Sequence, residues 1–242
     1  MPTHNDEVWK TCAVACAFLE GVRAAIPLAQ EQLDVMMRLI ESSGRPVNEF
    51  LDLGCGDGVL AAAIFARYPN ARGLLVDFSQ PMLEAAGSRF AGQRFAVRVA
   101  NADYGAASWV NEAGAMGPFD AIVSGFSIHH QEDDRKREVY REIFGLLAPG
   151  GVFVNVEHVA SATPWVAGMH DRLFVDQLAR YHSGRNRAEI EKTYYDRPDK
   201  DANILTAVET QCQWLREIGF SDVDCYLKIF ELAVFGGRKP GA

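Results

Sequence analysis

Short apolar runs alternate with amphipathic stretches through the middle of the chain. A short apolar run predicts a buried strand, and a stretch whose apolar residues recur every three or four positions predicts a helix. Strands that alternate with helices are typical of parallel sheets with right-handed crossovers. The expected strands are 47–53, 73–77, 95–100, 119–125 and, after a turn at 148–151, 152–156; the expected helices are 59–68, 81–90 and 133–147.

Helical patterns flank this alternating segment on both sides. Residues 6–40 show three- and four-residue apolar steps, and Pro27 has to begin or kink a helix, so we expect at least two helices there. Residues 164–196 form a long helical region with many polar and aromatic residues. A helix at 207–218 and two strands within 223–235 complete the pattern.

These patterns divide the chain into two expected parts. An N-terminal helical arm or lid covers 1–45, and a doubly wound α/β domain covers 46–242, with a helical cap insertion at 161–205. In sheets of this type, ligands bind at the carboxyl ends of the strands. We expect both helical parts to fold over that edge.

The charge balance argues against broad nucleic-acid binding. The 242 residues include 24 basic and 32 acidic side chains, and the resulting net charge of −8 repels phosphate backbones. The first ten residues do not form a secretory signal, and no run approaches the roughly 18 apolar residues of a membrane span. We therefore expect a cytoplasmic protein that does not enter membranes.

The five cysteines are scattered and lie mostly in apolar runs, which indicates reduced thiols and no disulfide framework. Cys12 and Cys16 share a helical face. Packing explains this pair better than metal binding, because no Cys-x-x-Cys accompanies it. The sequence predicts no metal site.

A glycine-rich turn at residues 54–58 carries the strongest chemical signal. Its sequence is Gly-Cys-Gly-Asp-Gly, and it joins an expected strand to an expected helix. Glycine lets a ligand lie against bare backbone, and the helix N-terminus offers free N–H groups. A plain strand-to-helix turn would explain the glycines as well.

Two carboxylates follow the next two strands. Asp77 can accept hydrogen bonds from both hydroxyls of a ribose, or it can cap the helix that begins near Pro81. Asp103 can accept from an adenine amino group, or it is an ordinary polar loop residue. Both positions favour an adenosine ligand at this edge of the sheet.

In this order and at this spacing, the motifs between residues 52 and 151 resemble those of class I S-adenosylmethionine-dependent methyltransferases. The matching pieces are Asp-Leu-Gly-Cys-Gly-Asp-Gly, Leu-Val-Asp-Phe-Ser, Asn-Ala-Asp, Phe-Asp-Ala-Ile-Val-Ser and Leu-Leu-Ala-Pro-Gly-Gly. The resemblance implies a mostly parallel, seven-stranded Rossmann-like sheet whose last strand runs antiparallel.

The same resemblance implies S-adenosylmethionine as the cofactor. Gly54, Gly56 and Gly58 would pack against its methionine part. Asp77 would hold the ribose, and Asp103 the adenine. Further expected contacts are Arg23, Asp52, Cys55, Phe78, Met82, Ala102, Ser124 and Gly125.

Catalytic candidates lie just past the fourth and fifth strands. A weakly acidic methyl acceptor needs a positioned general base, and His129, Glu157 and His158 are expected near the reacting edge of the sheet. His129 could instead start the next helix. Glu157 could instead cap a helix or join a salt bridge.

The flanking segments are more weakly similar to the carboxy-S-adenosylmethionine synthases of tRNA modification. The similar segments are 23–27, 168–171 and 208–220. The position that corresponds to a tyrosine of that family lies near Ala29. The position that corresponds to the family's arginine lies near Lys192 or Asp196, and Arg197 is only a displaced candidate for it. These departures argue against that activity, although Arg23 could still pair with the cofactor carboxylate or be a surface charge.

We therefore expect a methyltransferase that acts on a small-molecule acceptor by in-line displacement. The alternatives are a tRNA-modification enzyme of the carboxy-S-adenosylmethionine synthase type, and a non-catalytic cofactor-binding protein. The glycine spacing opposes a nicotinamide oxidoreductase. The N-terminal helices offer a surface on which two copies could pair as a homodimer.

Overall fold

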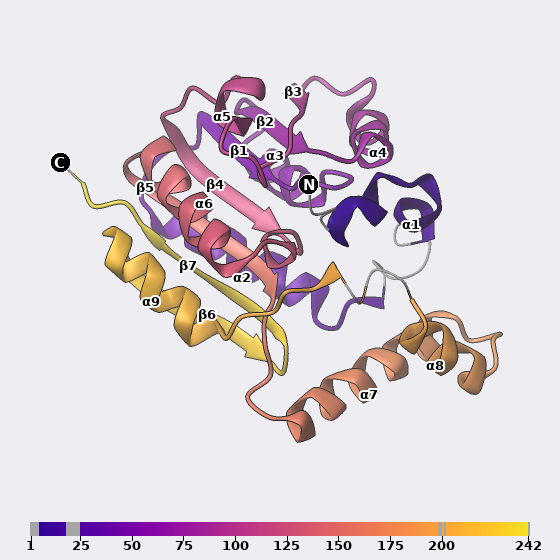
Figure 1. Ribbon diagram of the computed structural model, residues 1–242. Helices are drawn as coiled ribbons and strands as arrows, with labels where there is room; N and C mark the ends of the chain where they lie inside the picture. Colours follow the sequence, from indigo (N-terminus) through magenta and orange to yellow (C-terminus); the bar gives the residue numbers. More distant parts are fainter. Residues whose placement is uncertain (1–4, 18–24, 198–199, 201, 242) are drawn as a thin grey trace.

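A twisted, mostly parallel sheet forms the centre of the protein (Figure 1). The computed structural model describes residues 5–17, 25–197, 200 and 202–241. Within these residues the strands are β1 (Glu49–Leu53), β2 (Arg72–Asp77), β3 (Ala96–Asn101), β4 (Phe119–Gly125), β5 (Leu147–His158), β6 (Ser221–Ile229) and β7 (Leu232–Arg238). Their order is β3-β2-β1-β4-β5-β7-β6. Only β7 is antiparallel to its neighbours, β5 and β6, which confirms the predicted fold class.

Helices cover both faces of this sheet. They are α2 (Ala29–Ser42), α3 (Val59–Arg67), α4 (Gln80–Phe90), α5 (Trp109–Glu112), α6 (Asp133–Leu146) and α9 (Val208–Ile218), with a short 3-10 turn, η4 (Ile128–His130). Successive residues of a strand point to opposite faces of the sheet and so contribute to two separate hydrophobic cores. Leu51 and Leu53 pack with α5, α6 and α9, whereas Phe50 packs with α2, α3 and α4. The period of two along β1 therefore builds a doubly covered sheet.

The remaining helices flank the carboxyl ends of the parallel strands. At the N-terminus lie η1 (Asn5–Lys10) and α1 (Cys12–Ala17), and after β5 come α7 (Pro164–Tyr181) and α8 (Arg187–Tyr195). Figure 1 shows α7 and α8 as a pair that projects beyond the sheet. This pair has a small core of its own, formed by Ala25, Phe174, Val175, Leu178, Ile190 and Tyr194.

The helical region expected at 164–196 consists of two helices, because the chain turns after Tyr181 and the Asn186 side chain then caps α8 by accepting from the Ala188 N–H at 2.8 Å. One local expectation is wrong. The expected turn at 148–151 lies inside β5. There the pairing jumps from Phe119–Leu147 to Ala121–Val152, so these four residues bulge out of the ladder.

No helix in the described part of the chain combines the length and the apolar character that a bilayer span requires.

Candidate functional site

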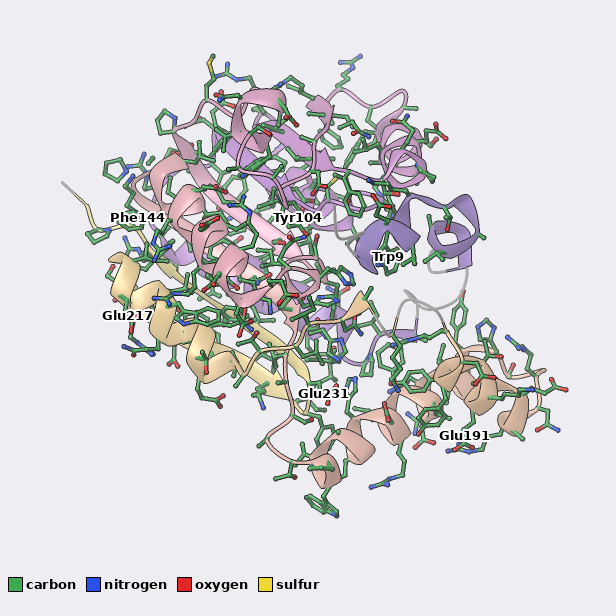
Figure 2. The ribbon with its side chains drawn as sticks, in the orientation of Figure 1. Trp9, Tyr104, Phe144, Glu191, Glu217 and Glu231 are labelled. Atoms are coloured by element: carbon green, nitrogen blue, oxygen red, sulfur yellow. The ribbon has the colours of Figure 1, made fainter. Side chains whose placement is uncertain are left out.

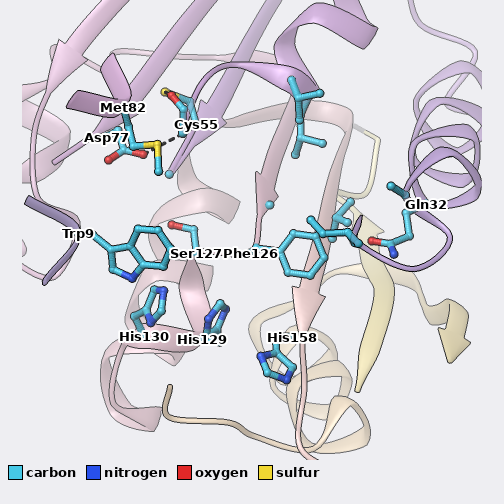
Figure 3. A pocket seen from close by; sticks show the side chains of 18 of the residues that line it. Trp9, Gln32, Cys55, Asp77, Met82, Phe126, Ser127, His129, His130 and His158 are labelled. Carbon is cyan, nitrogen blue, oxygen red and sulfur yellow. Dashed lines mark hydrogen bonds between the residues drawn. The ribbon is translucent and has the colours of Figure 1, made fainter. Parts of the chain in front are cut away.

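A cavity of about 290 Å³ lies at the carboxyl ends of the strands, where doubly wound sheets hold their ligands. Its walls come from the ends of β1, β2, β4 and β5, from η1 and α2, and from the α7–α8 insertion. Figure 3 shows Cys55, Asp77 and Met82 at one end of the cavity, and His129, His130 and His158 at the other.

Most of the expected site residues line this cavity together. They are Asp52, Gly54, Cys55, Gly56, Asp77, Phe78, Met82, Gly125, His129 and His158. Gly58, Ala102, Asp103, Ser124 and Glu157 lie outside the lining. Arg23 lies outside the described residues.

The glycine turn brings bare backbone to the cavity wall. Gly54, Gly56 and Gly58 have φ values of 68°, 53° and 78°, a left-handed conformation that favours glycine. A Cβ on Gly54 would collide with the Ser127 side chain, whereas a Cβ on Gly56 would meet nothing within 4 Å. Gly54 therefore serves close packing, and Gly56 leaves open space beside a ligand.

Asp77 braces the same turn. Its Oδ2 accepts from the Gly56 N–H at 2.9 Å, and its Oδ1 accepts from the Ser79 N–H at 2.8 Å. Burial raises the pKa of the Asp77 carboxyl to about 6, because it outweighs the lowering effect of these N–H donors. The group is therefore ionised at neutral pH and can accept hydrogen bonds from a diol.

Two other expected carboxylates have local partners. Asp103 Oδ1 accepts from the Gly105 N–H at 2.8 Å and so stabilises its own loop. Asp52 Oδ2 accepts from the Ala61 N–H at 3.0 Å, which fixes the first turn of α3 against the glycine turn.

His129 and Glu157 form a buried pair at the opposite end of the cavity. His129 Nδ1 lies 2.6 Å from Glu157 Oε1, and the carboxylate also accepts from the backbone N–H of His129 (3.2 Å) and of His158 (2.8 Å). Burial lowers the pKa of His129 well below its usual value and raises that of Glu157. The imidazole is therefore uncharged at neutral pH and faces the cavity, with Glu157 behind it.

Several lining residues were not predicted from the sequence. Trp9, His130, His170 and Asn203 also face the cavity, and so does Arg197, which the sequence offered only as a displaced match to a family arginine. His130 Nδ1 lies 3.0 Å from the Ala202 carbonyl oxygen, and its ring lies 5.8 Å from that of Trp9. These residues come from separate segments of the chain, and no spacing in the sequence pointed to them as a group.

A second histidine–carboxylate cluster adjoins the first. His158 Nε2 lies 2.8 Å from Glu231 Oε2. Burial, and then the charge of His158, lower the pKa of His170 to about 4. Burial alone would raise the pKa of Glu231, but hydrogen bonding with His158 helps to bring it below its usual value.

The comparisons with known proteins agree with this geometry. A family model described as a methyltransferase domain matches residues 50–151. An uncharacterized methyltransferase of Mycobacterium bovis is 39% identical over 132 residues, which cover 51% of this chain and 61% of that protein. The chain thus spans less than two thirds of the first curated relatives that it matches.

Other relatives match more of the chain. The ubiquinone/menaquinone biosynthesis C-methyltransferase UbiE of Desulfotalea psychrophila is 32% identical over 202 residues, covering 82% of this chain and 75% of that protein. A carboxy-S-adenosyl-L-methionine synthase of Desulforapulum autotrophicum is 24% identical over 238 residues, covering 94% and 90%.

The fold has a similar solved structure. An O-methyltransferase family protein of Burkholderia thailandensis superposes with a TM-score of 0.69 at 17% identity, covering all of this chain and 64% of that one. Sequence and fold lead to the same assignment: the chain belongs to the S-adenosylmethionine-dependent methyltransferase family.

Proposed function

We propose that this protein binds S-adenosylmethionine and transfers its methyl group to a small-molecule acceptor. One observation carries the proposal: a single cavity is lined at one end by Gly54, Gly56 and Asp77, and at the other by His129. Cofactor and acceptor would therefore meet inside one enclosed space.

The cofactor end has the chemistry that an adenosyl amino acid requires. Asp77 offers a buried carboxylate to the ribose hydroxyls, and Gly56 leaves room beside it. Met82 and Phe78 add apolar surface. That Asp103 contacts the adenine stays a hypothesis. That Arg23 pairs with the carboxylate of the cofactor stays one as well.

The acceptor end has a general base. When bound, the cofactor supplies a sulfonium methyl group, which needs alignment and a nucleophile. The uncharged His129 imidazole can take the proton of an acceptor O–H or N–H. Glu157 positions that ring and stabilises its charged form, and His158 lines the adjoining wall.

The lining favours a small and partly apolar acceptor. Ile26, Leu33, Phe126, Phe174 and Leu232 contribute apolar surface beside a few polar groups, as in sites for small molecules. The net charge of −8 disfavours a nucleic-acid acceptor.

A second candidate function is synthesis of a carboxylated cofactor. It is favoured by Arg197, which lines the cavity and could pair with an added carboxylate, and by the long match to a carboxy-S-adenosyl-L-methionine synthase. Mass spectrometry of the nucleosides bound to the purified protein separates the two functions.

Calorimetric titration with S-adenosylmethionine, S-adenosylhomocysteine and NAD tests the proposal. We expect micromolar binding of both adenosyl compounds, no binding of NAD, and loss of binding in Asp77→Ala. Binding of NAD alone would overturn the cofactor assignment. Cofactor binding without turnover across an acceptor screen would favour a non-catalytic binding protein.

We also infer a cytoplasmic location, since Cys55, Cys212 and Cys225 are free thiols. Pairing of two copies through the N-terminal helices stays a hypothesis, and size-exclusion chromatography with light scattering tests it.

A further inference from the structure

His158, His170 and Glu231 converge from three parts of the fold. His158 ends β5, and His170 lies in α7. Glu231 occupies the turn between β6 and β7 and is labelled in Figure 2. One potential ligand atom from each lies within 4.8 Å of the others. The backbone fixes two of them, because the Val159 N–H donates to the Glu231 carbonyl oxygen at 2.7 Å.

A simple ion pair explains only part of this cluster. His158 Nε2 is hydrogen-bonded to Glu231 Oε2 at 2.8 Å. His170 Nε2 lies 3.8 Å from the same oxygen, beyond hydrogen-bonding distance. Its Nδ1 is buried and has no hydrogen-bond partner among the described residues.

The His170 side chain is only 3% exposed, and its Nδ1 gains no hydrogen bond from the described residues in return for this burial. A buried polar group without a hydrogen-bond partner is unfavourable. A ligand seated among the three side chains would give the His170 ring a partner that the described residues do not provide.

The donor set indicates the nature of that ligand. Two imidazoles and one carboxylate are the three protein ligands of many catalytic zinc sites, which leave a fourth position open. Bonds of about 2.0–2.2 Å to a shared ion put two ligand atoms no more than about 4.4 Å apart, close to the 4.8 Å within which these atoms already lie. We propose that His158, His170 and Glu231 bind a divalent transition-metal ion, with Zn²⁺ the ion that this donor set suits best.

The position of the three side chains beside the cavity suggests a role for the ion in methyl transfer, and this role rests on the proposed function. His158 and His170 line the cavity, and the ring centroids of His129 and His158 lie 5.5 Å apart. An open coordination position would therefore face the acceptor end, beside the base. A hydroxyl or thiol bound to the ion loses its proton more readily, and His129 would receive that proton.

Metal titration of the untagged full chain tests the site without measuring turnover. We expect one equivalent of Zn²⁺ to bind in calorimetry, and Co²⁺ to give the visible absorption of a four-coordinate complex. His170→Asn and Glu231→Gln should each weaken binding at least 100-fold. The control His182→Ala removes a histidine just past the end of α7, outside the cavity lining, and should bind as the wild type does.

Circular dichroism and S-adenosylhomocysteine titration on the same samples keep the outcomes separate. Loss of metal binding in folded variants that still bind S-adenosylhomocysteine supports the site. No stoichiometric binding by the wild type, or equal binding by His170→Asn and Glu231→Gln, overturns it whatever the cofactor result. Metal binding without cofactor binding would leave the site intact and overturn the proposed function.

Discussion

At the scale of single residues, burial sets the chemistry of both ends of the cavity. Asp77 and Glu157 are carboxyl groups whose pKa values burial raises, while the His129 pKa is lowered for the same reason. The hydrogen-bond partners of the two carboxyl groups differ. Asp77 is held by backbone N–H groups, and Glu157 is held mainly against His129. One group is therefore suited to accept hydrogen bonds, and the other to orient a base.

The pKa of Asp77 predicts how cofactor affinity depends on pH. The carboxyl is ionised above about pH 6 and neutral below it, and only the ionised form accepts from both ribose hydroxyls. S-adenosylhomocysteine affinity should therefore be constant from pH 8 to 7 and about tenfold weaker at pH 5. Calorimetry at each pH measures this. Asp77→Asn should bind weakly with a flat profile, and a parallel decline in the variant would contradict the assignment.

Changing Gly54 to alanine should mainly lower stability, and changing Gly56 to alanine should mainly weaken ligand binding. Gly54→Ala forces a Cβ into Ser127 and adds left-handed strain, so the free energy of unfolding should fall by about 2–4 kcal/mol. Gly56→Ala adds only the strain, about 1–2 kcal/mol, but it fills space beside the ligand. Thermal unfolding and S-adenosylhomocysteine titration should show the larger stability loss in Gly54→Ala and at least tenfold weaker binding in Gly56→Ala. Equal stability losses would count against this reading.

At the scale of elements, α6 holds the segment that precedes α9. Lys136 is fully buried, and its Nζ donates to Asp133 Oδ1 (2.9 Å), the Ile204 carbonyl oxygen (2.5 Å) and Thr206 Oγ1 (2.7 Å). The Ile204 N–H in turn donates to the His129 carbonyl oxygen at 3.0 Å. A single buried lysine thus connects α6 to the backbone that carries the base.

Lys136→Met should loosen this connection. The methionine fills the space of the stem but leaves the oxygens around it without their donor, so the free energy of unfolding should fall by about 2–4 kcal/mol. Methyl transfer should slow while S-adenosylhomocysteine affinity stays near that of the wild type, because the glycine turn is untouched. Lys192→Met, on an exposed position of α8, is the control and should change neither quantity.

Sequence patterns predicted the elements well. Of the histidine and carboxylate groups near the end of the cavity opposite Asp77, they pointed to His129, Glu157 and His158 but not to His130, His170 or Glu231. Periods of two and of three to four located the five central strands and the helices between them, because burial imposes those periods locally. The turn at residues 54–58 could be predicted as part of the cavity wall, since its residues are contiguous. His158, His170 and Glu231 meet only through tertiary packing of β5, α7 and the β6–β7 turn, and no local pattern records such a meeting.

At the scale of the whole molecule, the cavity is closed from two directions. The N-terminal segment contributes Trp9, whose carbonyl oxygen accepts from Ser79 Oγ at 2.6 Å. The insertion contributes His170 and Phe174 from α7. A ligand in the cavity would therefore contact parts of the chain that lie outside the sheet.

Trp9 should report that closure. Cofactor analogues bound beside its ring should change the intrinsic fluorescence during titration with S-adenosylhomocysteine. The change should disappear in Trp9→Phe and persist in Trp214→Phe, because Trp214 belongs to α9 and packs with the core on one face of the sheet. A change that persists in Trp9→Phe and is lost in Trp214→Phe would place the binding event elsewhere.

The strand order also constrains when this site can exist during synthesis. β1 is central, yet one of its two neighbours, β4, follows β3 in the chain, with Phe50 opposite Ala121 and Leu53 opposite Ser124. Until β4 leaves the ribosome, β1 presents an open apolar edge, and Gly54 lacks the Ser127 side chain that packs on it. Such distant pairing is slow and exposes nascent chains to aggregation. A chain stalled on the ribosome before β4 should therefore bind no cofactor, and addition of cofactor should not protect it from aggregation.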